Sequence, residues 1–359
     1  MKIIQVIPFL GMGGAETMCE NLVYELKKLR HEVIVVSLYN KETVITQRLK
    51  EASVDVRFLD KKDGFDFSMF KKLKKLFKQE KPDVIHTHLY VTKYVFPVAS
   101  KLKIKVVHTI HSIATYEAGK ITRIFNNHYF RRGKAVPVAL SNNVKRTIIK
   151  EYKLNSDLIP IIYNGVDLDK CISKIDYEIK GNFKIIHVGS FMPVKNHKGL
   201  INAFEIFHEK NSNSELYLIG DGVLKCEIEQ LVQEKKLGGS VFFEGIQGNV
   251  FGFLYKMDMF TLPSFKEGVP MSLEEAMGTG LPIVATAVGG VPDMLDENSA
   301  QLVSVNEEEI AAAFEKYYLD YNLRKRHGEN ALKMSQRFSA ETMAKLYCNI
   351  YIGECRWNT

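Results

Sequence analysis

The sequence predicts an α/β protein with two doubly wound domains, each built on a parallel sheet. Short β-branched apolar runs alternate with helix-length amphipathic stretches, and this alternation fades between residues 164 and 182 before it restarts. The 359 residues, 46% of them hydrophobic, are enough for two cores. Ordinary glycine and proline contents exclude collagen-like and low-complexity classes.

The expected strands of the first domain are KIIQVIPF, EVIVVSLY, VDVRFLD, PDVIHTH, KVVHTIH, AVPVALS and IIYNGVD. Those of the second are FKIIHVGS, ELYLIGDG, VFFEG, MFTLPS, PIVATAV and QLVSV. We expect domains at residues 1–168 and 169–338. The helix expected over residues 339–359 returns to the first domain.

The charge is divided unevenly along the chain. Residues 1–170 hold 30 Lys and Arg against 17 Asp and Glu, whereas the remainder holds 19 against 25. A basic first domain suits an anionic partner such as a phosphate, a lipid headgroup or nucleic acid, although a solvated lysine surface is the commoner explanation. Five cysteines without CxxC spacing, and no signal or spanning segment, predict a cytoplasmic protein.

In open α/β sheets, ligands bind beyond the carboxyl ends of the strands. The GMGGAE loop, with Gly13 and Gly14, follows the first expected strand and opens a helix, so its amides could approach a phosphate closely. It is not the GxGxxG fingerprint of dinucleotide-binding proteins, and a ligand-free tight turn explains it about as well.

The most informative segment is PSFKEGVPMSLEEAMGTGLPIVAT, residues 263–286. Gly268 permits close backbone approach, and a helix from about Met271 would direct free N–H groups at an anion. Glu267 and Glu275 would flank that site and hold ribose or sugar hydroxyls. Taken alone, the pattern favours a plainer reading, in which Ser272 and Glu275 form a capping box at the helix start.

Other candidate side chains follow neighbouring strands. Lys195, six residues after the glycine that ends a strand, could neutralise a diphosphate, although a lone lysine there is usually solvated. Four histidines, His86, His88, His108 and His111, end two adjacent strands; they suit packed hydrogen-bonded positions better than a metal site. Of these, His111 is best placed to reach a ligand from its loop.

The segment from Phe67 to Lys81 has a helical apolar stripe with five lysines between its members. Such a helix usually packs its stripe on the sheet. Because the whole domain is basic, contact with an anionic membrane surface is the second possibility.

Together these motifs resemble glycosyltransferase family 4, whose members are retaining, nucleotide-sugar-dependent enzymes of the GT-B fold with two facing Rossmann-like domains. The resemblance covers nearly the whole chain. It rests on GGAE, SNNVKRTI, YNGVD, VGS…VKNHKGLINAF, IGDG and, most specifically, EGVPMSLEEAMGTGLPIVAT.

The resemblance implies roles for these residues. Glu267 would contact the donor sugar, Glu275 the ribose, and His111 the transferred sugar. The diphosphate would be bound by Lys195 and by the backbone following Gly268, at Met271 and Ser272. Gly13 and Gly14 would approach it from the other domain.

One position departs from the family pattern. Ser190 stands where the family commonly has an arginine, which puts donor affinity in question. Lys198, or Lys195 together with the helix amides, would have to supply the missing positive charge.

The resemblance also implies the reaction: transfer of a hexosyl or N-acetylhexosaminyl unit from a nucleotide sugar, expected to be a UDP-sugar, to a glycan or lipid-linked acceptor in bacterial surface polysaccharide synthesis. No cofactor or metal is expected, since no DxD-like acidic cluster accompanies these loops. The alternatives are a small-molecule glycosyltransferase or nucleotide-sugar epimerase on the same fold, and a dinucleotide-dependent oxidoreductase. A nucleic-acid partner is not expected, because the basic charge is diffuse.

Overall fold

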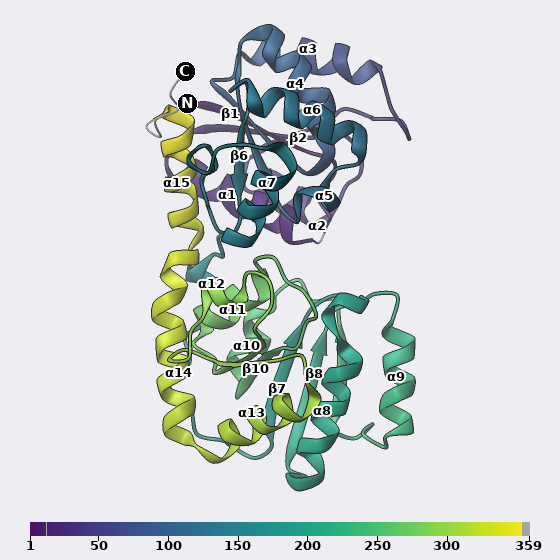
Figure 1. Cartoon of the computed structure of the whole chain (residues 1–359), viewed down its shortest axis with the longest axis vertical. Coiled ribbons are helices and arrows are strands. Elements are labelled where there is room, and N and C mark those ends of the chain that lie inside the picture. The colour runs from purple at the N-terminus through teal and green to yellow at the C-terminus, as the bar shows by residue number, and fades with distance from the viewer. Residues whose placement is uncertain (12, 354–359) are drawn as a thin grey trace. The chain divides into compact units, whose positions relative to one another are not determined.

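In a computed structural model, which describes residues 1–11 and 13–353, the chain forms two compact units (Figure 1). Unit 1 comprises Met1–Val166 and the chain from Ser339 onward, and unit 2 comprises Asp167–Phe338. Each unit contains one six-stranded parallel sheet with its own apolar core.

The sheet of unit 1 has the strand order β3-β2-β1-β4-β5-β6, which is the doubly wound Rossmann-like arrangement. Strand order reverses between β1 and β4, and ligands of such sheets bind at the carboxyl edge beside this reversal. The strands are β1 (Lys2–Ile7), β2 (Glu32–Ser37), β3 (Asp55–Phe58), β4 (Val84–His88), β5 (Lys105–Ile110) and β6 (Val136–Ala139).

Helices cover this sheet and bury its apolar side chains. The helices α3, α4 and α6 pack next to one another, while α1 packs against α2 and α15. The helices are α1 (Gly14–Lys28), α2 (Val44–Glu51), α3 (Ser68–Glu80), α4 (Thr92–Leu102), α5 (Ala114–Glu117), α6 (Lys120–Arg131), α7 (Asn142–Tyr152) and α15 (Ala340–Ile352).

One expected strand of the first domain is wrong. The segment IIYNGVD forms no ladder; it makes only isolated bridges, from Ile161 to Ala139 and from Val166 to Ser339. Ile162 and Val166 are buried all the same, because the segment crosses beside β6 and then meets the start of α15. A buried connection and a strand give the same short apolar run in sequence.

Helix α3 packs as the commoner explanation of its sequence predicts. Leu73, Leu76 and Phe77 lie in the core of unit 1, and its lysines face solvent or neighbouring loops. Phe67 departs from the expected stripe, because it precedes the helix and is 78% exposed. None of the described helices is long and apolar enough to cross a bilayer.

The last described helix returns to unit 1, as expected. The Ser339 hydroxyl caps α15 by accepting from the Thr342 amide at 3.0 Å. Gly165 lies so close to this helix that a Cβ there would come within 2.6 Å of the Ala340 Cα. A glycine is therefore needed where the connection meets α15.

Unit 2 has the sheet order β12-β11-β10-β7-β8-β9, again parallel throughout. All six expected strands are present: β7 (Phe183–Val188), β8 (Ser214–Ile219), β9 (Val241–Gly245), β10 (Met259–Leu262), β11 (Ile283–Thr286) and β12 (Gln301–Val303). The helices are α8 (His197–Lys210), α9 (Lys225–Glu234), α10 (Phe251–Lys256), α11 (Met271–Thr279), α12 (Val291–Met294), α13 (Glu307–Leu319) and α14 (Tyr321–Ser335).

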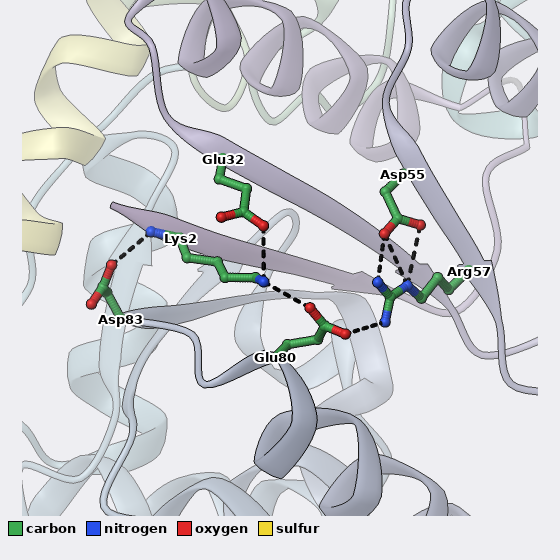
Figure 2. Close-up of polar contacts among 6 residues, drawn as sticks. All are labelled: Lys2, Glu32, Asp55, Arg57, Glu80 and Asp83. Atoms are coloured by element: carbon green, nitrogen blue, oxygen red, sulfur yellow. Dashed lines mark hydrogen bonds and ion pairs between the residues drawn. The ribbon is translucent and has the colours of Figure 1, made fainter.

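An ion-pair network connects the strands of unit 1 with the end of α3 (Figure 2). Glu80 contacts Lys2 and Arg57 at 2.7 Å each, Lys2 also reaches Glu32 at 2.8 Å, and Arg57 reaches Asp55 at 2.6 Å. Lys2, Glu32 and Asp55 stand at strand starts, so this network stabilises the edge opposite to the one where ligands are expected.

Candidate active site

In unit 2, two loops at the carboxyl edge of the sheet are held side by side. One follows β7 and the other follows β10. The Phe265 amide donates to the Val194 carbonyl at 2.9 Å, and the Asn196 side chain donates to the Pro263 carbonyl at 3.0 Å. Asn196 has a positive φ of 56° and also caps α8. Its side chain therefore fixes both the helix start and the neighbouring loop.

These loops bring together two of the predicted residues, Lys195 and Glu267. The Lys195 Nζ lies 2.7 Å from the Glu267 Oε1, with the side chains 17% and 7% exposed. Ser264 donates its hydroxyl to the same oxygen at 2.5 Å. An ion pair this sheltered from water is stronger than a surface pair, and its ammonium can also bind an anionic ligand.

The helix start beside this pair is open, and the capping-box interpretation is wrong. Pro270 occupies the N-cap and supplies no side-chain cap, so Ser272 lies inside the first turn, where its hydroxyl cannot act as the cap. The Met271 and Ser272 amides donate no hydrogen bond to the described residues. Helix α11 therefore offers free N–H groups to an anion beside Lys195 and Glu267.

Glu275 lies on the same helix, one turn further on. Its side chain is half-buried and has no described hydrogen-bond partner, and burial raises the pKa of its carboxyl to about 8. The adjacent Glu274 is fully buried with neither oxygen hydrogen-bonded, and burial raises its pKa well above the usual value. Glu275 is therefore mostly protonated at neutral pH, and a ligand that donates hydrogen bonds to it must favour the ionised form.

Sequence reasoning missed three residues that position Glu267. Ser264 donates to its carboxylate, and the Thr286 hydroxyl donates to the Ser264 carbonyl at 2.6 Å. Gly289 has a φ of +60°, and a Cβ there would lie 1.8 Å from the Glu267 carbonyl oxygen. The Gly289–Gly290 doublet directly after an expected strand was a usable turn signal for this close approach.

Ser190 replaces the arginine that is common in the family, and Lys198 is one residue that could supply the missing charge. Both side chains are exposed. Neither side chain contacts the Lys195–Glu267 pair among the interactions described. Lys195, in contrast, forms an ion pair with Glu267 in this part of the described chain.

In unit 1, the glycine loop leads directly into α1. Gly13 is the N-cap with no side-chain cap, and a Cβ on it would lie 2.5 Å from the Glu16 Oε2. Gly14, in contrast, has open space where a Cβ would be. Burial raises the pKa of the Glu16 carboxyl, which lies over the loop. A side chain at position 13 would thus displace the Glu16 carboxylate, whereas Gly14 has open space beside it.

His111 follows β5 at the same sheet edge as the glycine loop, which follows β1. Its Nε2 lies 3.0 Å from the His88 Nδ1, and His88 in turn contacts Gln5 at 2.8 Å. Burial lowers the pKa of His111 to about 4 and that of His88 well below its usual value, so both rings are neutral at pH 7. No group of three or more His, Cys, Asp or Glu in the described chain could hold a metal ion.

The two Rossmann-like units give this chain the GT-B fold of its structural neighbours. The chain belongs to glycosyltransferase family 4. The profile for Glycosyltransferase Family 4 matches residues 12–170, and that for Glycosyl transferases group 1 matches residues 172–334.

Several proteins of known identity are similar to this chain. N-acetyl-alpha-D-glucosaminyl L-malate synthase of Bacillus anthracis is 28% identical over 81% of this chain and 80% of its own length. UDP-Gal:alpha-D-GlcNAc-diphosphoundecaprenol alpha-1,3-galactosyltransferase of Escherichia coli is 31% identical over 61% of each chain. HepE of Anabaena, crystallised with UDP-glucose, shares the fold with a TM-score of 0.84 at 19% identity, over 98% of this chain and 100% of its own.

Proposed function

We propose that this enzyme transfers a hexosyl or N-acetylhexosaminyl unit from a UDP-sugar to a glycan or lipid-linked acceptor, with retention of configuration, in bacterial surface polysaccharide synthesis. The observation that carries the donor assignment is the Lys195–Glu267 pair next to the uncapped start of α11. Cation and free amides together form a site for a diphosphate.

Each residue has a proposed role. The diphosphate is bound by Lys195 and by the backbone that follows Gly268, at the Met271 and Ser272 amides. Glu275 accepts hydrogen bonds from the ribose hydroxyls. Glu267 accepts from the donor sugar. From unit 1, Gly13 and Gly14 approach the diphosphate and His111 contacts the transferred sugar. Ser190 lies at the edge of the donor site.

In the proposed reaction the bond from the anomeric carbon to the diphosphate oxygen breaks as the bond to the acceptor oxygen forms on the same face. The acceptor proton passes to the departing diphosphate. Lys195 and the α11 amides stabilise the negative charge that develops on the leaving group. Glu267 is held by Lys195 and Ser264, so it orients the sugar and is not assigned as a nucleophile.

The relatives support a nucleotide-sugar donor and leave two acceptor classes. The E. coli relative is named for a diphosphoundecaprenol-linked acceptor, whereas the B. anthracis relative is named for L-malate, a small molecule. HepE was crystallised with UDP and with UDP-glucose. A lipid-linked acceptor is favoured here by the basic first domain, and a small-molecule acceptor is the second candidate.

A thermal-shift series with nucleoside diphosphates tests the donor. UDP is expected to raise the melting temperature more than ADP, GDP or CDP, because a ligand that binds only the folded state stabilises it. UDP-sugars are then incubated with lipid-linked, glycan or small-molecule acceptors, and UDP release is measured. Sugar transfer supports the proposal, whereas sugar isomerisation or hydride transfer to a nicotinamide would replace it.

Exposed apolar side chains of unit 1 suggest a surface that contacts the membrane holding a lipid-linked acceptor. Tyr116, Ile121 and Ile124, in and before α6, are 77%, 67% and 69% exposed, and Phe65 and Phe67 are exposed before α3. Crossover helices begin at the carboxyl edge of a parallel sheet, so both groups lie toward the edge that carries His111. Helix α6 contains no acidic residue.

We therefore propose a cytoplasmic enzyme that touches the anionic inner face of the plasma membrane through this part of unit 1. Vesicles containing anionic lipid are expected to bind the protein at low salt, and neutral vesicles are expected to bind it less. Replacing Ile121 and Ile124 with serine should weaken binding about tenfold or more, since each isoleucine inserts apolar surface. The matched change Leu319→Ser, at an exposed leucine of unit 2, should leave vesicle binding unchanged. If the wild-type protein does not bind anionic vesicles, this proposal is contradicted.

A further inference from the structure

Behind His111 a chain of buried side chains crosses three adjacent strands of unit 1. Gln5 lies on β1, His88 ends β4, and His111 follows β5. The Gln5 Oε1 is 2.8 Å from the His88 Nε2, and the His88 Nδ1 is 3.0 Å from the His111 Nε2. Gln5 and His88 are fully buried, whereas His111 is partly exposed. The chain therefore runs from the core to the candidate site.

The direction of these hydrogen bonds follows from what each atom can do. A carbonyl-type oxygen such as Gln5 Oε1 only accepts, so His88 Nε2 carries the proton and donates. A neutral imidazole has one N–H, which leaves His88 Nδ1 as an acceptor, and His111 Nε2 must then donate to it. The remaining nitrogen of His111, Nδ1, is left with a bare lone pair.

The orientation of the Gln5 amide sets the direction of the whole chain. The structure places the Gln5 Oε1 toward His88, 2.8 Å from its Nε2. The Gln5 Nε2 is buried and has no hydrogen-bond partner among the described residues. In this orientation Gln5 can only accept from His88.

Other titratable groups around the pair do not reverse this arrangement. His86 and His108 are buried beside His88, and the nearby carboxylate, Glu117, lies 3.5 Å from the His108 Nε2. His111 Nδ1 has no hydrogen-bond partner among the described residues. It is available to a ligand.

We propose that Gln5 and His88 are positioning residues that hold His111 in its neutral Nε2–H tautomer, so that Nδ1 accepts a hydrogen bond from a hydroxyl of the transferred sugar. This inference rests on the proposed function for the sugar contact. The tautomer itself follows from unit 1 alone. In the opposite tautomer, His111 would present an N–H and would select a sugar oxygen that accepts.

Nitrogen-15 NMR of the histidine rings tests the tautomer without any catalysis, because the two neutral tautomers give distinct ring-nitrogen shifts and couplings. The wild-type enzyme is expected to show protonated Nε2 and unprotonated Nδ1 at His111. A protonated Nδ1 in the wild type overturns the proposal.

Variants test whether Gln5 and His88 set the tautomer of His111. Gln5→Met should convert His111 to a mixture of tautomers and lower kcat/KM at least about fivefold, the effect of losing one hydrogen bond. Gln5→Glu, which still accepts from His88, should retain the tautomer. Tyr152→Phe is the matched control: it removes a buried hydroxyl of unit 1 that accepts from the Asn126 side chain at 3.4 Å and contacts neither Gln5, His88 nor His111, so tautomer and rate should stay unchanged.

The outcomes distinguish the positioning of His111 from the proposed function. If Gln5→Met leaves the tautomer and the rate unchanged, Gln5 and His88 do not position His111, while sugar transfer by the wild type still supports the proposed function. A wild-type protein with the expected tautomer but no activity on any nucleotide sugar contradicts the proposed function and the sugar contact with it.

Discussion

Replacing Lys195 with alanine is expected to lower turnover at least tenfold, which corresponds to about 1.4 kcal/mol in the activation barrier. The ammonium lies beside the free amides of α11, where the departing diphosphate gains negative charge. Steady-state kinetics with the UDP-sugar identified by the donor screen measure the effect. The loss should fall mainly on kcat, because the charge of the leaving group grows in the transition state.

A matched ion pair in the same unit provides the control. Lys235 contacts Glu205 at 2.5 Å away from the α11 start, with the two side chains 22% and 29% exposed. Lys235→Ala removes a similar pair and should leave turnover unchanged. Equal kinetics for wild type and Lys195→Ala would remove Lys195 from the donor site.

For Glu275, the expected result is a pH dependence of UDP affinity that the Glu275→Gln variant lacks. The pKa of about 8 keeps this carboxyl mostly protonated at pH 7, whereas accepting two ribose hydroxyls favours the carboxylate. UDP binding should therefore tighten as pH rises toward 8 and level off above it. If only the carboxylate binds, the change approaches about tenfold per pH unit below the pKa.

Calorimetric titration of both proteins between pH 6 and 9 measures this difference, and comparison with Glu275→Gln cancels the titration of the nucleotide itself. UDP binding to the wild type should also release a proton near pH 7, visible in buffers of different ionisation enthalpy. Glu275→Ala should reduce turnover at least about tenfold at pH 8, where the carboxylate is well populated. Parallel pH profiles for wild type and Glu275→Gln would contradict the ribose assignment.

Much of the fold could be predicted because periodicity reports local structure. Alternating β-branched runs and amphipathic stretches predicted both sheets, and the buried stripe of α3 followed from its helical spacing. The segment 161–167 was misassigned, because burial by α15 produces the same apolar run as pairing in a sheet. Only the path of the chain distinguishes the two.

The candidate site was predictable to the extent that its residues are local in sequence. Glu267 and Glu275 share one segment, but the capping box failed because Pro270 already occupies the N-cap. The contact of Glu267 with Lys195 spans 72 residues and depends on β7 lying next to β10. No local spacing predicts it; the family resemblance implied only that both residues belong to the donor site.

The Gln5–His88–His111 chain could not be predicted from spacing at all. Gln5 is 83 residues from His88, and the two meet only because β1 and β4 are neighbours in the sheet. Its direction depends further on which atom of the Gln5 amide faces His88, and the structure places the Oε1 there. The sequence therefore predicted His111 at the candidate site but not Gln5 and His88, the two residues that hold it.

A crystal structure of the enzyme with UDP tests the donor site most directly. The diphosphate is expected to lie within hydrogen-bond distance of the Lys195 Nζ and the Met271 and Ser272 amides, with the ribose hydroxyls on the Glu275 carboxylate. A nucleotide bound away from the α11 start, with the Lys195–Glu267 pair untouched, would contradict the account.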